Sequence, residues 1–187
     1  EIAVPSGVGF DANGSARGAM GIDWAYFQND GSLALAIGNF ANETTALYVT
    51  DSPQSFLFSD QANIYGLGAP TQPPLKFGLF FFDYDNDGRL DLLSANGHLE
   101  NEISKVQASQ SYEQAAQLFW NTGKARRDVF AFVGPEAAGP DLFKPIVGRG
   151  SAYGDLDGDG DLDVVLTANG GPPLVVRNDG GNGKKWL

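Results

Sequence analysis

Two short runs of the sequence repeat the spacing D-x-D-x-D-G-x-x-D, which gathers four carboxylates within nine residues. Carboxylates brought this close repel one another strongly unless a cation lies between them. A ligand set made only of oxygen favours Ca²⁺ over zinc or copper. The sequence therefore predicts two calcium sites, with Asp83, Asp85, Asp87 and Asp91 in one run and Asp155, Asp157, Asp159 and Asp163 in the other.

The spacing of these aspartates has a geometric reason. Side chains at the first, third and fifth positions converge when a loop curls around an ion, and a glycine at the sixth, Gly88 or Gly160, permits the sharp turn. The backbone carbonyl of the seventh residue, Arg89 or Asp161, is expected as a further ligand, so the Asp161 side chain is expected to face solvent. Two alternatives stay open: an acidic hairpin turn without metal, and Mg²⁺, which prefers stricter octahedral geometry.

A third stretch, Tyr26–Asn39, follows the same pattern but lacks most of the carboxylates. Tyr26, Gln28 and Ala34 stand where aspartates are expected, and only Asp30 remains. Too few oxygen ligands are left to complete a calcium shell. We expect a turn of the same shape, held by hydrogen bonds and packing, without calcium.

An EF-hand loop starts with a similar run of residues. It needs a ligand at position 12 and a helix on each side. Position 12 is Ser94 or Leu166 here, and the flanking residues favour strands. The sequence therefore argues against an EF-hand.

The segments around the three stretches have the composition of short β-strands, bounded by Gly, Asn, Asp or Pro. First strands are expected at Met20–Phe27, Phe77–Phe82 and Gly150–Gly154, and a Leu-, Val- or Ile-rich second strand follows each loop. Third strands are expected at Ala46–Thr50, Gln117–Asn121 and Leu174–Asn178, and fourth strands at Ser55–Ser59 and Asp128–Val133. Four antiparallel strands per repeat, at a period of about 55–75 residues, are typical of β-propeller blades.

We therefore expect an all-β fold: a partial β-propeller of about three four-stranded antiparallel blades. Residues 1–19 would end a preceding blade, 20–76 form a blade with the degenerate loop, 77–147 a blade with a calcium loop and a helical insertion, and 148–187 a blade with a calcium loop. The insertion is expected to hold one or two helical turns, because Leu99, Ile103 and Val106 have helical spacing. A partner-binding helix is the alternative there. Since about three blades do not close a ring, the rest of a larger propeller or other chains would complete it.

The net charge of −11 and the lack of cysteine narrow the function classes. A negative chain repels nucleic-acid phosphates and anionic membranes, and the basic clusters 124–127 and 184–185 are too short to form a groove. No apolar run approaches the ~18 residues that span a bilayer. We expect no nucleic-acid partner, no membrane insertion, and a secreted or cell-surface location, with the periplasm as an alternative.

The sequence holds no recognisable catalytic constellation, and we predict that the chain is not an enzyme. His98 is the only histidine and is expected to be structural, at a strand end. Motifs of serine hydrolases, zinc proteases and phosphate-binding loops are missing from the sequence. Trp24, Trp120 and Trp186 are expected in the core between sheets rather than on a sugar-binding surface.

The D-x-D-x-D-G-x-x-D loop between two strands resembles the FG-GAP/VCBS repeats of integrin-α-like propellers. The stretches Gly18–Phe27 (GAMGIDWAYF), Ser94–Ile103 (SANGHLENEI), Val147–Pro173 and Val175–Leu187 are similar to the bacterial relatives of cartilage acidic protein. In that family a VCBS propeller is followed by an ASPIC/UnbV domain, and the closing RNDGGN…WL resembles the junction where that domain begins. The resemblance implies a seven-bladed, secreted, calcium-loaded propeller used for binding or adhesion.

Three functions remain open. The leading hypothesis is a non-catalytic extracellular module, in which calcium pins the hairpins and the loops contact a protein or glycan. The second is a self-assembling surface or filament subunit that binds other copies of itself, because three blades would leave apolar strands unpaired at their ends. The third is a propeller fragment of a secreted carbohydrate-active enzyme, although no acid–base pair outside the calcium loops supports it.

Overall fold

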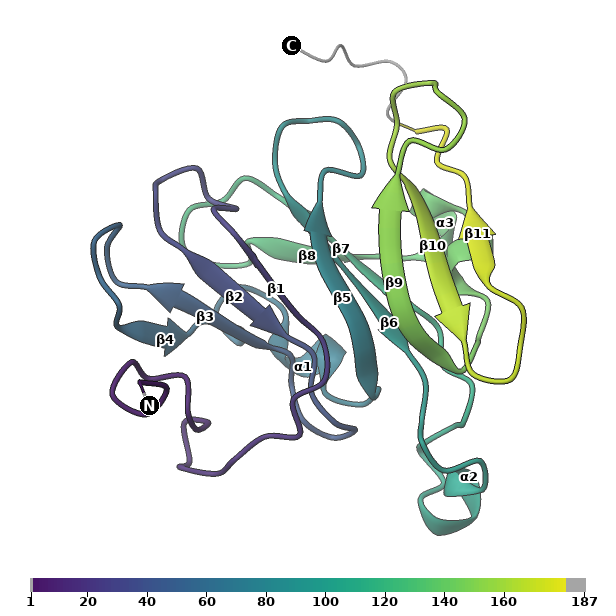
Figure 1. Cartoon of the computed structure of the whole chain (residues 1–187), viewed down its shortest axis with the longest axis horizontal. Coiled ribbons are helices and arrows are strands. Elements are labelled where there is room, and N and C mark those ends of the chain that lie inside the picture. The colour runs from purple at the N-terminus through teal and green to yellow at the C-terminus, as the bar shows by residue number, and fades with distance from the viewer. Residues whose placement is uncertain (1, 181–187) are drawn as a thin grey trace.

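The computed structural model describes residues 2–180, in which eleven strands form three antiparallel sheets (Figure 1). The first sheet contains β1 (Ile22–Ala25), β2 (Ala34–Ile37), β3 (Ala46–Thr50) and β4 (Phe58–Asp60). The second contains β5 (Lys76–Phe82), β6 (Asp91–Asn96), β7 (Gln117–Asn121) and β8 (Phe130–Val133). The third contains β9 (Gly148–Gly154), β10 (Asp163–Ala168) and β11 (Leu174–Val176). The prediction of an all-β chain is confirmed, while residues 181–187, with most of the RNDGGN…WL motif and Trp186, lie outside the described part.

The first two strands of each sheet pair in an equivalent register. Within each sheet the strands follow chain order, and each pairs antiparallel with the next. In the first two strands of each sheet, Trp24 faces Leu35, Phe81 faces Leu92 and Tyr153 faces Val164. Each of these pairs lies one pair away from the Asp-rich loop or its degenerate counterpart, so residues can be compared position by position between the sheets.

Several expected strands begin or end one to three residues away from the strands observed. The first is shorter than Met20–Phe27, and β4 starts three residues later than Ser55. The backbone N–H of Ser55 donates to the Ser52 carbonyl at 3.0 Å, closing a turn around Pro53. The turn occupies residues that by composition alone favour a strand.

The sheets stack face to face, and the second sheet is buried on both sides. Leu79 and Phe81 belong to the core that it shares with the first sheet, whereas Phe80 and Phe82 belong to the core that it shares with the third. Successive side chains of a strand point to opposite faces, so a run such as KFGLFFF is apolar on both. Burial on both faces fixes the place of the second sheet between its neighbours.

The first strands of the three sheets lie next to one another, with β5 between β1 and β9 (Figure 1). Two glycines at the same register position permit this approach. A Cβ on Gly21 would meet the Phe77 carbonyl oxygen at 1.9 Å, and a Cβ on Gly78 would meet the Ser151 backbone nitrogen at 2.7 Å. Any side chain at either position would push adjacent sheets apart.

The helices are single turns that decorate the connections: α1 (Gly68–Thr71), α2 (Ile103–Val106), α3 (Pro135–Ala138) and the 3₁₀ turn η1 (Asp141–Phe143). The predicted helical turn in the long connection is confirmed by α2, although Val106 is 83% exposed there. Among the described helices, none combines the length and the apolar character that crossing a membrane requires.

A buried lysine ties the first sheet to the start of β5. Lys76 has no exposed surface, and its Nζ donates to the carbonyls of Glu43, Thr71 and Pro74 at 2.6, 2.5 and 2.8 Å. Burial lowers the pKa of Lys76 to about 7, and the charge of Glu43 opposes that change. The three acceptors also favour the ammonium, because only the protonated form has three N–H donors.

Replacing this lysine is expected to be costly. Lys76→Met removes all three hydrogen bonds and leaves buried carbonyls without a donor, which should lower the free energy of unfolding by about 2–4 kcal/mol. Urea denaturation measures the change. Lys105→Met is the matched control, because Lys105 is exposed and its ammonium pairs only with Glu102 on the surface. Equal stability of the two variants would contradict the structural role of Lys76.

Candidate metal centres

Three hairpin loops connect the first and second strands of the sheets: the first loop (26–33), the second loop (83–90) and the third loop (155–162). Each contains two left-handed residues at the same positions. Their φ angles are 55° and 81° at Asn29 and Gly31, 54° and 85° at Asn86 and Gly88, and 80° and 97° at Gly158 and Gly160. The prediction that the degenerate first loop keeps the same turn shape is confirmed.

The second loop brings three of its four predicted aspartates together. Carboxylate oxygens of Asp83, Asp85 and Asp91 lie within 4.8 Å of one another. The loop backbone orients Asp83, which accepts hydrogen bonds from the N–H groups of Asp87 at 3.0 Å and Gly88 at 2.8 Å. This geometry presents an all-oxygen cluster that can hold a metal ion.

Asp91 forms the buried floor of this cluster. Its carboxylate accepts from the backbone N–H groups of Tyr84 at 3.0 Å and Asn121 at 2.7 Å. Burial raises the pKa of Asp91 to about 7; the two backbone donors oppose the rise, and the charges of Asp85 and Asp87 add to it. A bound cation would remove the repulsion and favour the ionised carboxylate.

The Asp87 carboxylate is not part of this three-carboxylate group. It forms an ion pair with Arg89 and accepts from Trp120 Nε1 at 3.4 Å. The Arg89 guanidinium also donates to the Asn121 carbonyl at 2.8 Å and lies over the Trp120 ring, 5.6 Å from its centroid. The seventh residue of the loop, predicted to offer its carbonyl, thus supplies a cation that holds Asp87 beside the cluster.

The third loop forms a second and more open cluster. Carboxylate oxygens of Asp155, Asp157 and Asp159 lie within 4.8 Å of one another, and all three residues are exposed. Asp155 is oriented by the N–H groups of Gly158 at 2.7 Å and Gly160 at 3.2 Å. The pKa of Asp157 is raised, first by loss of solvent and then by the charge of Asp159. This loop therefore also offers oxygen ligands for a metal ion.

Asp163 and Asp161 differ from the predictions made for them: Asp163 as a side-chain ligand, and Asp161 with its side chain in solvent. Asp163 stays outside the three-carboxylate group, and like Asp91 it accepts two backbone N–H groups, those of Leu156 and Asn178, both at 2.8 Å. The expectation that the Asp161 side chain faces solvent is wrong, because Asp161 is 1% exposed. At the equivalent position of the second loop, Arg89 also turns back toward its sheet and donates to the Asn121 carbonyl at the end of the third strand.

Two asparagines, which we call the asparagine latches, join each cluster to the loop before it. Asn121 donates through Nδ2 to the carbonyls of Leu90 in the second loop and Phe27 in the first loop, both at 3.1 Å. Asn178 repeats the pattern, donating to Tyr84 at 2.6 Å and Leu162 at 3.4 Å. The backbone N–H of each latch bonds the last aspartate of its run.

The first loop is closed without such a cluster. Asp30 caps the turn by accepting from Ser32 N–H at 2.8 Å, as Asp87 and Asp159 do in the other loops. Thr50 occupies the latch position. Its N–H donates to the Leu33 carbonyl and its hydroxyl accepts from the Leu33 N–H, both at 2.9 Å. These contacts replace those that Asp91 and Asn121 make in the second loop.

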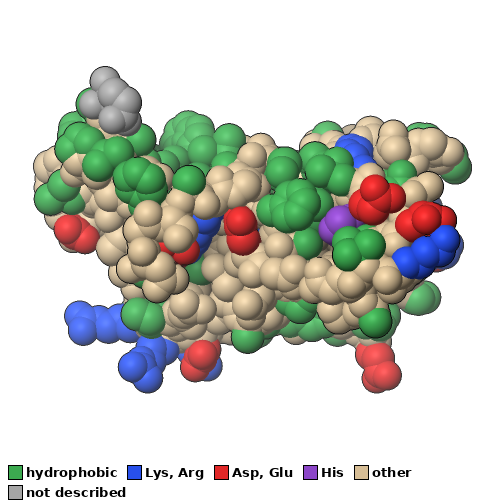
Figure 2. Space-filling view, turned by 90° about the horizontal axis from the view of Figure 1, so that it is seen from below, with side chains coloured by type: hydrophobic (Ala, Val, Ile, Leu, Met, Phe, Trp, Pro, Cys, Tyr) green, Lys and Arg blue, Asp and Glu red, His purple; other side chains and the backbone are tan. Residues whose placement is uncertain are grey.

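The other predicted side chains lie away from these loops. His98 is buried; its Nδ1 accepts from Glu100 N–H at 3.1 Å and its ring packs edge-on against Phe40, a structural role. Trp24 is 61% exposed, which contradicts its expected place in the core, because its side of the first sheet faces no other described sheet. Figure 2 shows the end of the molecule opposite the Asp-rich loops, where acidic side chains are scattered rather than gathered.

The asparagine latches are the site residues that sequence reasoning missed. The signal was present, because both repeats with aspartate clusters end their third strand in asparagine (QLFWN and LVVRN), whereas the first ends in threonine (ALYVT). The change at this position accompanies the loss of the carboxylates.

No protein-family model matches this chain, and no curated protein matches it.

Proposed function

We propose that this chain is part of a calcium-stabilised β-propeller of the FG-GAP/VCBS repeat type, serving outside the cell as a non-catalytic module that binds a protein or glycan. One observation carries the proposal: two equivalent hairpin loops in consecutive sheets each gather three carboxylates within 4.8 Å. Two three-carboxylate clusters, each on a loop of the same backbone shape, are not expected of ordinary surface acids.

The arrangement of the sheets supports a propeller. In that architecture, small antiparallel sheets stack in chain order around an axis. Gly150 holds the register position of Gly21 and Gly78, the two glycines that admit the next sheet, and its own Cβ direction meets only the Thr167 side chain. A fourth sheet of the same kind would fit against this side of β9.

The ligand chemistry supports calcium. The clusters offer carboxylate oxygens without nitrogen or sulfur, which is the ligand type that Ca²⁺ prefers. Extracellular modules commonly bind calcium at ~10⁻⁴–10⁻³ M, which suits sites as open as the third loop.

Calcium titration by calorimetry tests the proposal, with two ions per chain as the expected stoichiometry. The pair Asp83→Asn and Asp85→Asn should remove one ion, and the pair Asp157→Asn and Asp159→Asn should remove the other. Asp30→Asn in the first loop is the matched control and should leave two. Absence of binding at 10-fold the ~10⁻³ M limit would contradict the proposal.

A second candidate, self-assembly into a surface layer or filament, is favoured by one observation. Ile22 and Trp24 are each 61% exposed on the same face of β1, at the positions where Leu79 and Phe81 pack against a neighbouring sheet. An apolar sheet face of this kind suits another sheet. Light scattering that finds only a compact monomer at high concentration would exclude this candidate.

A further inference from the structure

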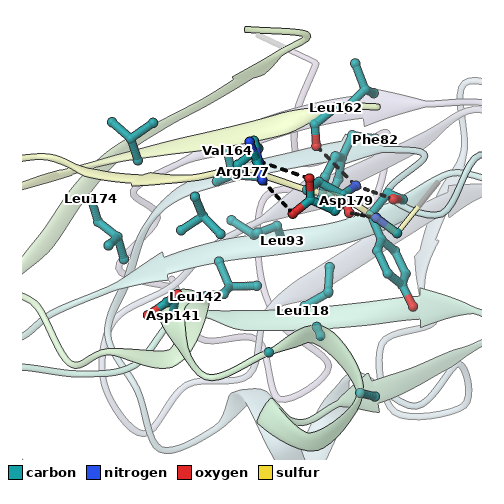
Figure 3. Close-up of a pocket in the computed structure, with 18 of the residues that line it drawn as sticks. Phe82, Leu93, Leu118, Asp141, Leu142, Leu162, Val164, Leu174, Arg177 and Asp179 are labelled. Carbon is teal, nitrogen blue, oxygen red and sulfur yellow. Dashed lines mark hydrogen bonds and ion pairs between the residues drawn. The ribbon is translucent and has the colours of Figure 1, made fainter. Parts of the chain in front are cut away.

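Two cavities lie against the second sheet. The larger, of about 680 Å³, opens between the second and third sheets (Figure 3), and its wall reaches Gly180, where the described part of the chain ends. The smaller, of about 380 Å³, lies where β5 and β7 begin and β6 ends, at the end of the second sheet opposite its Asp-rich loop (Figure 1). We call this smaller cavity the amide cleft, after four side chains in its wall: Asn96, Gln110, Gln114 and Gln117.

The amide cleft has hydrogen-bond acceptors that the described chain does not use. The side-chain amides of Asn96 and Gln117 donate to the carbonyls of Ala115 and Pro70, both at 2.8 Å. Their oxygens, Oδ1 and Oε1, are buried and accept no hydrogen bond from any described residue. The exposed Glu113 carboxylate in the same wall also has no partner among the described residues. Because a buried acceptor without a donor is costly, this wall favours a ligand that brings O–H or N–H groups.

Other hydrogen bonds hold the wall of the cleft in place. Gln114 is 8% exposed; its Oε1 accepts from the Leu75 N–H at 3.0 Å and its Nε2 donates to Gln110 Oε1 at 3.1 Å. Gln110, 5% exposed, donates in turn to the Pro73 carbonyl at 2.7 Å. A wall fixed in this way loses little conformational freedom when a ligand binds.

An exposed aromatic ring lies on another side of the cleft. Phe132 is 50% exposed, and its ring packs edge-on against the rings of Phe119 and Phe143, with centroids 5.7 and 6.3 Å away. Phe132 pairs with Phe119 across β7 and β8, and Gln117 stands two residues before Phe119 on the same face of the sheet. The cleft therefore combines an apolar ring with polar acceptors along one sheet face, as ligand sites of proteins commonly do.

We infer that the amide cleft binds a neutral oligosaccharide. The C–H face of a sugar ring packs on the exposed ring of Phe132, and sugar hydroxyls donate to the Glu113 carboxylate and to Gln117. The inference rests on the proposed function of binding a protein or glycan, and it assigns the ligand class and the place of binding.

The composition of the wall favours a sugar over a polypeptide or a charged polymer. Four lining residues are prolines, which have no backbone N–H to offer to the carbonyls of a peptide: Pro70, Pro73, Pro74 and Pro145. A sugar hydroxyl supplies the donor that the unused acceptors lack. Glu113 is the only ionisable side chain among the described lining residues, so the cleft has no cation to hold an anionic polymer.

Affinity electrophoresis of the full chain in calcium tests the ligand class. Native gels contain galactomannan, xyloglucan or hydroxyethyl cellulose as neutral glycans, alginate as an anionic glycan, or gelatin as a polypeptide. Retardation in at least one neutral-glycan gel, and none in alginate or gelatin, is expected. Retardation by gelatin alone would assign the cleft to polypeptides, and unchanged migration in all three neutral gels would overturn the inference.

Substitutions in the cleft test the place of binding. Phe132→Ala and Glu113→Ala should each weaken retardation by about 5-fold or more, because a stacking surface or a hydrogen-bond acceptor is lost. Phe56→Ala and Glu136→Ala are the matched controls, since both residues are exposed and lie outside the lining of the cleft. Both controls should be retarded like the unaltered protein.

Glu113→Ala keeps the test independent of folding, because its carboxylate has no partner among the described residues. If this variant were retarded as strongly as the unaltered protein, the cleft would not be the glycan site. Calcium titration of the same preparations separates the two proposals. Two bound ions without any retardation would overturn the glycan site and leave the calcium-stabilised propeller intact.

Discussion

Excess chelator is expected to lower Tm by about 10–20 °C relative to saturating calcium. A ligand at 100 times its Kd stabilises the folded state by about 2.7 kcal/mol per site, and each kcal/mol corresponds to about 2–4 °C in a domain of this size. Two sites with clustered carboxylates therefore account for the range. Scanning calorimetry in calcium and in chelator measures the shift.

The direction of this shift follows from the charges of the clusters. Without a cation, Asp83 and Asp85 lie beside the buried Asp91, whose pKa is raised first by burial and further by the charges of Asp85 and Asp87. Mg²⁺ at the same concentration is the control and should restore less of the Tm, because it gives up its waters reluctantly. Superimposable melting curves in calcium and chelator would show that the loops are stable without metal.

The second large effect is expected at an asparagine latch. Asn121→Ala removes the donor that serves the carbonyls of Phe27 and Leu90, and Asn121 is only 2% exposed, so both acceptors lose their partner. The free energy of unfolding should fall by about 2–4 kcal/mol. The variant keeps the backbone N–H that orients Asp91 but loses the side-chain contacts that hold this backbone in place, so calcium affinity at the second loop should fall as well.

Chemical denaturation and calcium titration of the same variant separate the two consequences. Asn169→Ala is the matched control, since Asn169 is exposed and its side-chain amide donates only to the Tyr112 hydroxyl, at 3.2 Å. This control should change the free energy of unfolding by less than about 0.5 kcal/mol. If Asn121→Ala were as stable as the control, the asparagine latches would not contribute to the stability of the site.

Much of the fold could be predicted because local composition and global packing agree. The run KFGLFFF is apolar on both faces and is buried on both, and the Asp-rich runs fall between strands as their spacing indicates. Where the predicted start of β4 was wrong, a local contact decided the outcome. Ser55 closes a turn instead of starting a strand.

The parts of the site that could not be predicted from the sequence depend on tertiary contacts. Asp87 matches the loop pattern, yet its carboxylate pairs with Arg89, which Trp120 and Asn121 hold in place from another strand. Spacing along the chain carries no information on such a competitor. The hydrogen bond from Asn121 to the Phe27 carbonyl joins residues far apart in the sequence, so it could not be predicted from spacing either.

The hydrogen bonds of the latches between sheets all run in one direction along the chain, from a later sheet to an earlier one. Asn121 donates to a carbonyl in the first loop and Asn178 to one in the second, so the second and third sheets each depend on an acceptor in the sheet that precedes them along the chain. During synthesis on the ribosome, the amino-terminal part of a chain folds first. The acceptor in the preceding sheet would then be in place before the latch that binds it is synthesised. The sheets would therefore pack against one another in the order in which they are translated.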